Sequence, residues 1–273
     1  MHPREHARLA RFGGVTRGNP SSVVETTDWI SPDPPQPVER PMLRQAWRTC
    51  SFLHWPYAPD VLRRHVPSRF ELDVADGSAW VSLISFSIPT MRPLGLPPVP
   101  GFDRAAESHL RTYVVDPQGR RGIWMLSLDI DPVQAAMAGR LFLLPYWWAT
   151  IEVERASDLA RYRVDRHAPG VGRVELEMDI GDVIPSAALG DLDHFLTARW
   201  ILYAGAAGAS VAMFTEHPPW RMRETSIRSI RQSVSKHLGL PEPGRPPVLH
   251  FSDGVDARLS RPFPVAAPPQ GRV

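Results

Sequence analysis

Residues 107–114 read Glu-Ser-His-Leu-Arg-Thr-Tyr-Val and alternate between polar and less polar side chains. Successive side chains of a β-strand point to opposite faces, so the ionisable and phenolic groups of this stretch share one face. That face consists of Glu107, His109, Arg111 and Tyr113. Such a face either meets solvent, as polar strand faces usually do, or lines the polar interior of a barrel.

Runs rich in β-branched and aromatic residues lie on both sides of this stretch and are separated by turn signals. The clearest signal is Asp76–Gly77, because Asp-Gly provides the positive φ that a tight hairpin turn requires. The predicted strands cover residues 71–74, 79–88, 110–115, 123–128, 146–154, 161–164, 173–178, 200–204 and 210–215. This pattern predicts a mainly β (α+β) protein, as an antiparallel β-barrel or double sheet with a few short helices.

Three segments carry helical signals. Asp131–Pro132 offers a side-chain acceptor at the N-cap and a proline at the first helical position, which predicts a helix over 131–144. Apolar residues at helical spacing predict a second helix over 226–238. Its basic face, which includes Lys236, is expected to meet solvent rather than nucleic acid. A short third helix is predicted over 59–66.

The proline distribution predicts the domain organisation. Residues 1–40 contain several prolines among polar residues without an apolar period, so they are expected to form a flexible tail. Residues 41–265 show no linker and are predicted to be one domain, and residues 266–273 form a second tail. With 43% hydrophobic and 22% charged residues, the 273-residue chain has enough apolar material for a full core.

Composition and missing motifs exclude several function classes. Cys50 is the only cysteine, so an internal disulfide and a thiolate zinc site are excluded. A formal charge of +2 favours no binding to nucleic acid or membrane. The sequence has neither metal-ligand spacing nor a glycine-rich cofactor loop nor a Gly-x-Ser-x-Gly elbow. We therefore expect no metal and no cofactor, and a cytoplasmic protein that can form a homo-oligomer.

Six sequence blocks resemble a known family. They are Phe52-Leu-His-Trp-Pro-Tyr57, Asp76-Gly-Ser-Ala-Trp-Val81, Leu110-Arg-Thr-Tyr-Val114, Gly122-Ile-Trp-Met-Leu-Ser-Leu-Asp129, Glu216-His-Pro-Pro-Trp220 and His250-Phe-Ser-Asp-Gly-Val-Asp256. In this order they resemble the YqjF-like family of bacterial proteins, over residues 42–265. The resemblance implies a distant relationship to acetoacetate decarboxylase and its antiparallel β-barrel around a small-molecule cavity.

The resemblance also implies positions for active-site groups. Glu107 takes the position of an active-site carboxylate, and Tyr146 takes that of the lysine that forms the Schiff base in the decarboxylase. A tyrosine cannot form an imine, and the only lysine, Lys236, is expected on a solvent-facing helix. The sequence therefore predicts that the protein is not a Schiff-base decarboxylase.

The remaining polar groups suit a different chemistry. Arg111 presents a planar fork for a carboxylate or carbonyl, Glu107 suits proton transfer, and Tyr146 can donate to a developing oxyanion. We expect these three as catalytic residues for enolisation, dehydration, cyclisation or isomerisation of a small oxygenated compound, as in a lyase, isomerase or cyclase. The alternative is a non-catalytic protein that binds or senses a small molecule with the same fold.

Further aromatic and histidine side chains are candidates for substrate binding. The rigid His217-Pro-Pro-Trp220 corner either places an imidazole at a pocket rim or has a purely structural function. Trp147 is expected to fill the core. The candidate substrate-binding residues are His54, His109, Tyr113, Trp124, Trp148, His217 and Trp220.

Overall fold

The β-strands of the protein join into one continuous sheet. The computed structural model describes residues 23–25, 30–93, 97, 104–168, 172–206 and 208–266. The strands are β1 (Val23–Glu25), β2 (Leu43–Tyr57), β3 (Glu71–Ala75), β4 (Ser78–Pro93), β5 (Ala105–Val115), β6 (Arg121–Asp131), β7 (Tyr146–Arg155), β8 (Leu159–Arg166), β9 (Arg173–Val183), β10 (Ile201–Ala206), β11 (Ala209–Glu216), β12 (Met222–Gln232), β13 (Val248–Leu259) and β14 (Phe263–Pro264). The helices are α1 (Pro59–Arg63), α2 (Val133–Arg140), α3 (Asp191–Thr197) and α4 (Val234–His237), with a 3-10 turn at Ser186–Ala188.

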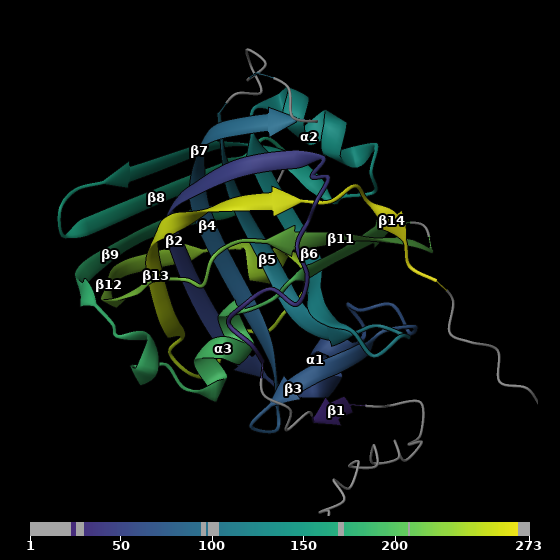
Figure 1. Ribbon diagram of the computed structural model, residues 1–273. Coiled ribbons are helices and arrows are strands. Elements are labelled where there is room, and N and C mark those ends of the chain that lie inside the picture. Colours follow the sequence, from purple (N-terminus) through teal and green to yellow (C-terminus); the bar gives the residue numbers. More distant parts are fainter. Residues whose placement is uncertain are drawn as a thin grey trace, which may run out of the picture.

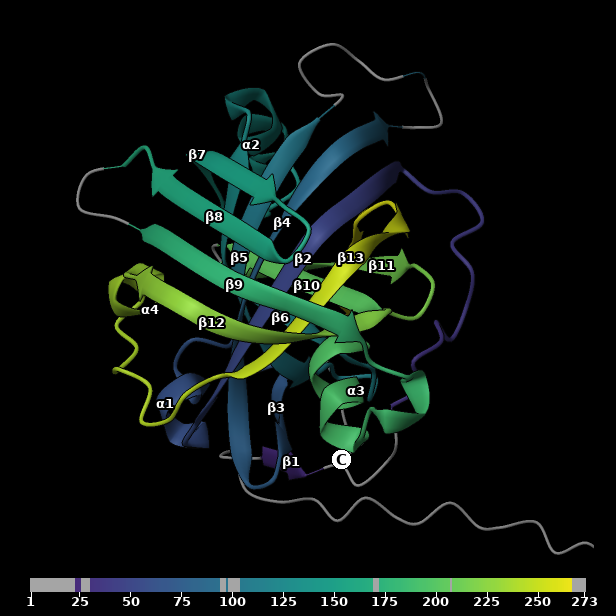
Figure 2. The same ribbon diagram turned by 90° about the vertical axis from the view of Figure 1, so that its left-hand side faces the viewer.

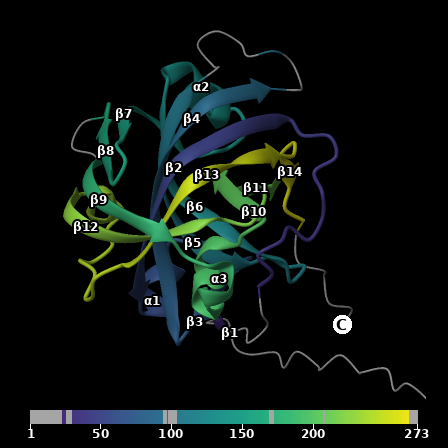
Figure 3. The same ribbon diagram turned by 60° about the vertical axis from the view of Figure 1, so that its left-hand side comes forward.

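Strand pairing closes this sheet into two rings that share a wall. The shared wall consists of β13, β2, β4, β5 and β6, which pair in that order. The larger ring continues from β13 through β12, β9, β8 and β7 back to β6, and the smaller ring continues through β11 and β10 back to β6. Figure 3 shows β8, β9 and β12 on one side of the shared wall and β10, β11 and β14 on the other. The predicted mainly β, barrel-like fold is therefore confirmed.

The larger ring is filled by side chains. Alternate residues of the shared wall, such as Leu53, Leu83 and Leu110, belong to the same buried cluster as Ile151 and Leu176 from β7 and β9. Figure 2 shows β7, β8, β9 and β12 crossing in front of the shared wall. Burying these aliphatic side chains contributes about 1.5–3 kcal/mol each, so this ring supplies much of the stability of the fold.

Two helices mark the opposite ends of the shared wall. Figure 1 shows α2 at one end of β4, β5 and β6 and α3 at the other. β5 runs between them, with Ala105 at the α2 end and Val115 at the far end. A side chain on β5 therefore lies nearer to α2 or to α3 according to its position along the strand.

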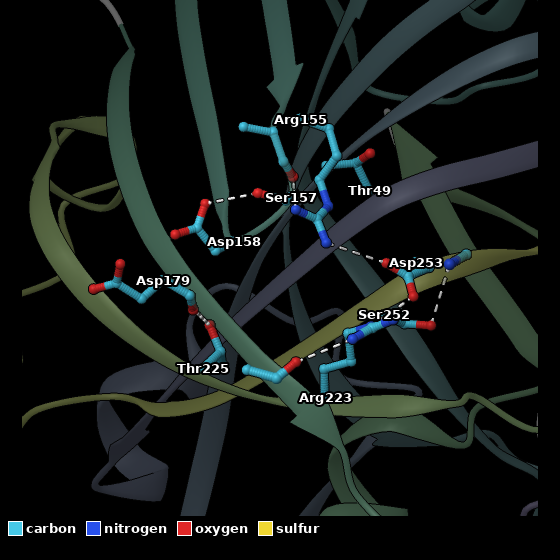
Figure 4. Close-up of polar contacts among 12 residues, drawn as sticks. Thr49, Arg155, Ser157, Asp158, Asp179, Arg223, Thr225, Ser252 and Asp253 are labelled. Carbon is cyan, nitrogen blue, oxygen red and sulfur yellow. Dashed lines mark hydrogen bonds and ion pairs between the residues drawn. The ribbon is translucent and has the colours of Figure 1, made fainter.

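The branch point of the two rings lies at Asp253–Gly254. β13 pairs with β12 up to Ser252 and with β11 from Arg258 onward. Figure 4 shows Arg155 and Arg223 approaching Asp253, at 3.6 Å and 2.6 Å. Gly254 has φ +128°, and an added Cβ would collide with the carbonyl of Trp47 on β2. Only glycine therefore fits where β13 turns from the larger ring into the smaller one.

Several sequence predictions of secondary structure are wrong. The segment predicted as a helix over 226–238 is strand β12 followed by the short α4. α2 spans Val133–Arg140 rather than 131–144, and its N-cap is Pro132, so Asp131 does not cap it. The predicted Asp76–Gly77 hairpin between β3 and β4 is confirmed, with φ values of +52° and +67°.

Parts of the predicted N-terminal tail lie against the domain. β1 pairs in parallel with β3, and Val38 is buried with its N–H donating to Glu216. Residues 1–22, 26–29 and 267–273 lie outside the described residues. The division into two flexible tails and one domain stays a prediction.

Candidate functional site

The smaller ring encloses a cavity of about 420 Å³. Each strand of this ring contributes to its wall, and residues of α2 and residues next to α3 contribute at the two ends. Most of the lining is apolar. The polar and aromatic members with chemistry to offer are Glu107, His109, Arg111, Tyr146, Thr197, Arg199, His217 and Trp220.

Glu107 is the centre of a hydrogen-bonded group at the α2 end of the cavity. The hydroxyl of Tyr146 donates to Glu107 Oε2 at 3.0 Å, and His109 Nδ1 lies 3.0 Å from Glu107 Oε1. Because a carboxylate accepts, His109 carries its proton on Nδ1 and presents a lone pair on Nε2. Within the described residues, the buried Nε2 has no hydrogen-bond partner. The α2 end therefore combines a carboxylate, a phenol and a free imidazole nitrogen.

Burial sets the protonation states of this group. Burial, with Glu107 beside it, raises the pKa of Tyr146 well above its ordinary value of 10.0. Burial lowers the pKa of His109 below 6.5, although its bond to Glu107 acts in the opposite direction. Near neutral pH, Tyr146 is thus a protonated donor and His109 is neutral.

The position of Tyr146 depends on α2. A Cβ added to Gly139 would collide with the ring of Tyr146, so the glycine makes the space that the ring occupies. The carbonyl of Tyr146 accepts a hydrogen bond of 2.7 Å from Arg140 Nε. The end of α2 and the start of β7 therefore hold the phenol against Glu107.

Arg111 lies at the α3 end of the cavity. Its Nη2 donates to the carbonyl of Leu196 at 3.1 Å, and the hydroxyl of Tyr113 donates to the same carbonyl at 2.7 Å. No carboxylate of the described residues forms an ion pair with Arg111, and its Nε has no partner there. A buried cation without a counter-charge is costly. The α3 end is therefore suited to bind an anion.

Backbone carbonyls in the last turn of α3 accept hydrogen bonds from side chains at the α3 end of the cavity. Phe195 accepts from Arg199 Nε at 2.8 Å, and Thr197 accepts from Trp220 Nε1 at 3.2 Å. These carbonyls have no partner inside the helix, because the last turn of a helix leaves its C=O groups free. α3 thus positions Arg111, Arg199 and Trp220 together.

Arg199 differs from Arg111 because it has a carboxylate partner. Its Nη1 lies 2.6 Å from Asp73, which also accepts from Arg121 Nε at 2.8 Å. Burial alone would raise the pKa of Asp73, but the two guanidinium groups hold it below 3.8. One carboxylate thus pairs with two arginines, whereas Arg111 has no ion-pair partner among the described side chains.

The His217-Pro-Pro-Trp220 corner lines the cavity. His217 Nδ1 donates to the carbonyl of Pro218 at 2.7 Å, and its ring lies 4.6 Å from that of Trp220 between ring centroids. Burial, with Arg111 nearby, lowers the pKa of His217 to about 4. His217 is therefore neutral near pH 7 and presents Nε2 as an acceptor.

Four of the predicted substrate-binding residues do not line the cavity. His54 and Tyr113 lie behind Arg111, both hydrogen-bonded to Ser82 at 2.6 Å. Trp124 is buried against Phe70 on the face of β6 turned away from the cavity, because its neighbours Ile123 and Met125 occupy the cavity face. Trp148 is 44% exposed and packs on His167. The sequence alternation did not show which strand face was inside.

Lys236 and Trp147 both lie outside the cavity. Lys236, the single lysine of the chain, is exposed on α4, so the described lining of the cavity offers no amine for an imine. Trp147 is 37% exposed, against the expectation that it fills the core, and Arg166 lies over its ring. The described residues contain no group of three or more potential metal ligands, and none of their helices is long and apolar enough to span a bilayer.

Sequence reasoning missed the support for the cationic end. Arg199 and its partner Asp73 are 126 positions apart, and neither belongs to a motif. The Leu196 carbonyl gives no sequence signal at all. In the sequence, only Arg111 on the polar strand face indicated a cationic site.

Comparisons with known proteins agree with this architecture. Residues 44–256 match DUF2071, a family described as uncharacterized conserved proteins. The uncharacterized protein YqjF of Bacillus subtilis (strain 168) is 31% identical over 216 residues, covering 79% of this chain and 89% of the relative.

Solved structures with a similar fold include enzymes. The enduracididine biosynthesis enzyme MppR complexed with pyruvate has a TM-score of 0.61 and 13% identity, covering 85% of this chain and 94% of that one. An acetoacetate decarboxylase-like enzyme from Sphingomonas wittichii RW1 has a TM-score of 0.60 and 12% identity, covering 89% and 100%. At these identities the likeness shows the fold alone.

Proposed function

This chain belongs to the DUF2071 family, and we propose that it is an enzyme that moves protons on a small carbonyl or carboxylate compound without forming a Schiff base. The observation that carries the proposal is the hydrogen bond from Tyr146 to Glu107 in the same cavity as Arg111, which has no carboxylate partner among the described residues. MppR, which has the same fold, was solved with pyruvate, a keto acid.

Each group suits one part of an enolisation. Glu107 removes a proton from the carbon next to the substrate carbonyl, and the electron pair of that C–H bond moves to the carbonyl oxygen. As Glu107 takes up the proton, the hydroxyl hydrogen of Tyr146, retained because its pKa is raised, turns from Glu107 and is donated to the resulting enolate oxygen. Return of the proton to a different carbon, or loss of a neighbouring leaving group, completes an isomerisation or a dehydration.

Arg111 supplies the positive charge that binds the substrate. Its guanidinium stays charged at any physiological pH and has no carboxylate partner among the described side chains. A substrate carboxylate would provide the missing counter-charge and fix the orientation of the substrate. Imine chemistry is not part of the proposal, because the described lining of the cavity contains no lysine.

Proton exchange in D₂O tests the proposal. We expect the wild-type protein to replace the α-protons of keto acids, from pyruvate to 7-oxooctanoate, with deuterium faster than buffer does, as followed by ¹H NMR. Glu107→Gln should lower the exchange rate on the order of 10²–10⁴-fold, the usual contribution of a general base. Glu177→Gln on β9, outside the cavity, is the matched control.

A non-catalytic binding protein would behave differently in the same experiment. If keto acids bind but are recovered without deuterium, or if Glu107→Gln exchanges as fast as the wild type, the proposal fails. The first of these results would favour a carrier or sensor.

A further inference from the structure

The anion-binding group and the proton-transfer group lie at opposite ends of the cavity. Glu107 and Arg111 are four residues apart on β5, so their Cα atoms are separated by roughly 13 Å in a strand that rises about 3.3 Å per residue. The Arg111 head group does not reach back toward Glu107. It lies beside Tyr113, with its Cζ 5.9 Å from that ring, and donates to Leu196.

The remaining contacts preserve this separation. Tyr146 and Glu107 are held together next to Gly139 of α2, whereas Arg111 is held by the end of α3. The two helices lie at opposite ends of the shared wall (Figures 1 and 3). His109 lies between the two groups, and its Nε2 has no hydrogen-bond partner among the described residues. A molecule as short as pyruvate therefore contacts one group or the other, but not both.

The space between and beside the two groups is apolar and adaptable. Four of the eight methionines of the chain line the cavity: Met42, Met91, Met125 and Met213. Methionine side chains adjust their shape to flexible apolar ligands. The cavity of about 420 Å³ equals the volume of roughly fourteen waters in liquid, at about 30 Å³ each. It is therefore larger than a three- or four-carbon keto acid requires.

From this geometry we infer that the substrate is an elongated monocarboxylate whose reacting carbonyl is separated from its carboxylate by an apolar chain. The carboxylate binds Arg111, the carbonyl oxygen accepts from Tyr146, and the chain lies along β5 past His109. Subtracting two hydrogen bonds of about 2.9 Å from the separation leaves roughly 7 Å. About five or six carbon–carbon bonds span that distance, because each ~1.5 Å bond of an extended zigzag chain advances only about 1.25 Å along the chain axis. This substrate class rests on the proposed function, because it places the carbonyl at the proton-transfer group.

Calorimetric titration with a set of length-matched probes tests the inference. The probes are levulinate, 7-oxooctanoate and neutral 2-octanone. We expect 7-oxooctanoate to bind at least tenfold more tightly than levulinate. Arg111→Met should weaken its binding at least tenfold and change that of 2-octanone less than threefold. Arg228→Met, an exposed arginine of β12, is the control for loss of charge.

A second variant tests the path between the two ends. Ile84 on β4 pairs with His109 and lines the cavity, so Ile84→Phe adds bulk midway between Glu107 and Arg111. It should weaken 7-oxooctanoate binding at least fivefold. This variant decides the question if Arg111→Met does not fold, which circular dichroism would show.

The outcomes separate this inference from the proposed function. If levulinate binds as tightly as 7-oxooctanoate, or if neither variant weakens the binding of 7-oxooctanoate, the inference is overturned even when short keto acids exchange deuterium. If binding depends on length and on Arg111 as expected but no probe exchanges deuterium, the elongated anion stands as the ligand class and the proposed enzyme activity falls.

Discussion

Gly139 of α2 lies so close to the Tyr146 ring that any side chain at position 139 would displace the phenol. We predict that Gly139→Ala separates stability from activity. Alanine is the better helix former, by about 1 kcal/mol, but its methyl group moves the Tyr146 hydroxyl away from Glu107. Deuterium exchange should fall at least tenfold while the melting temperature changes by only a few degrees. Gln134→Ala, at an exposed position of the same helix, is the control, and equal exchange by both variants would contradict the prediction.

The phenolic hydroxyl itself can be removed without changing the ring. Tyr146→Phe keeps the packing against α2 but loses the donor to Glu107 Oε2. We expect exchange to decrease on the order of 10²-fold, as for loss of one donor to an oxyanion. The dissociation constant of 7-oxooctanoate should rise much less, since Arg111 holds the carboxylate. A loss of binding without a loss of turnover would assign Tyr146 to substrate binding instead.

Buried histidines make the fold sensitive to acid. His217 has its pKa lowered to about 4 by burial, whereas in the unfolded chain it is near 6.5, so the unfolded state takes up more protons between these pH values. Stability is therefore fully present above pH 6.5 and decreases as the pH falls toward 4, by about 3 kcal/mol for this residue alone. His54 and His109 shift in the same direction.

Urea denaturation across that pH range measures this effect. The free energy of unfolding of His217→Gln should fall less steeply between pH 6.5 and 4 than that of the wild type. An unchanged slope would show that His217 is not buried in its neutral form.

The branch point of the sheet depends on a glycine. At Gly254, φ is +128° and a Cβ would collide with the Trp47 carbonyl. We expect Gly254→Ala to destabilise the protein by about 3 kcal/mol or more, because strain and collision add. Gly119→Ala is the matched control, since Gly119 also has a positive φ, +78°, but open space around it. It should cost only about 1 kcal/mol, and equal losses by chemical denaturation would contradict the assignment.

Two long strands of the shared wall, β2 and β13, were not predicted from the sequence. β2 is buried on both faces over residues 49–55, so its sequence shows no alternation of polar and apolar residues. β12 was mistaken for a helix for a different reason. A register shift between Ile227 and Ser229 brings Ile227 and Ile230 against the same core, which reproduces helical spacing.

Part of the candidate site could be predicted from the alternation of polar and less polar residues along β5. Alternation along β5 grouped Glu107, His109 and Arg111, and they do line one cavity. Alternation also placed Tyr113 on that face, but its hydroxyl is taken by Leu196 and Ser82 behind the lining. Whether a tryptophan faces the cavity or the outside depends on ring closure, which no local pattern encodes.

The shared wall makes this protein a favourable starting point for laboratory evolution. The cavity-lining residues Leu202 of β10, Met213 of β11 and Ala138 of α2 do not belong to the buried cluster that fills the larger ring. Libraries that randomise those lining positions should thus yield a high fraction of folded clones, and selection could then explore new ligands without compensating mutations elsewhere.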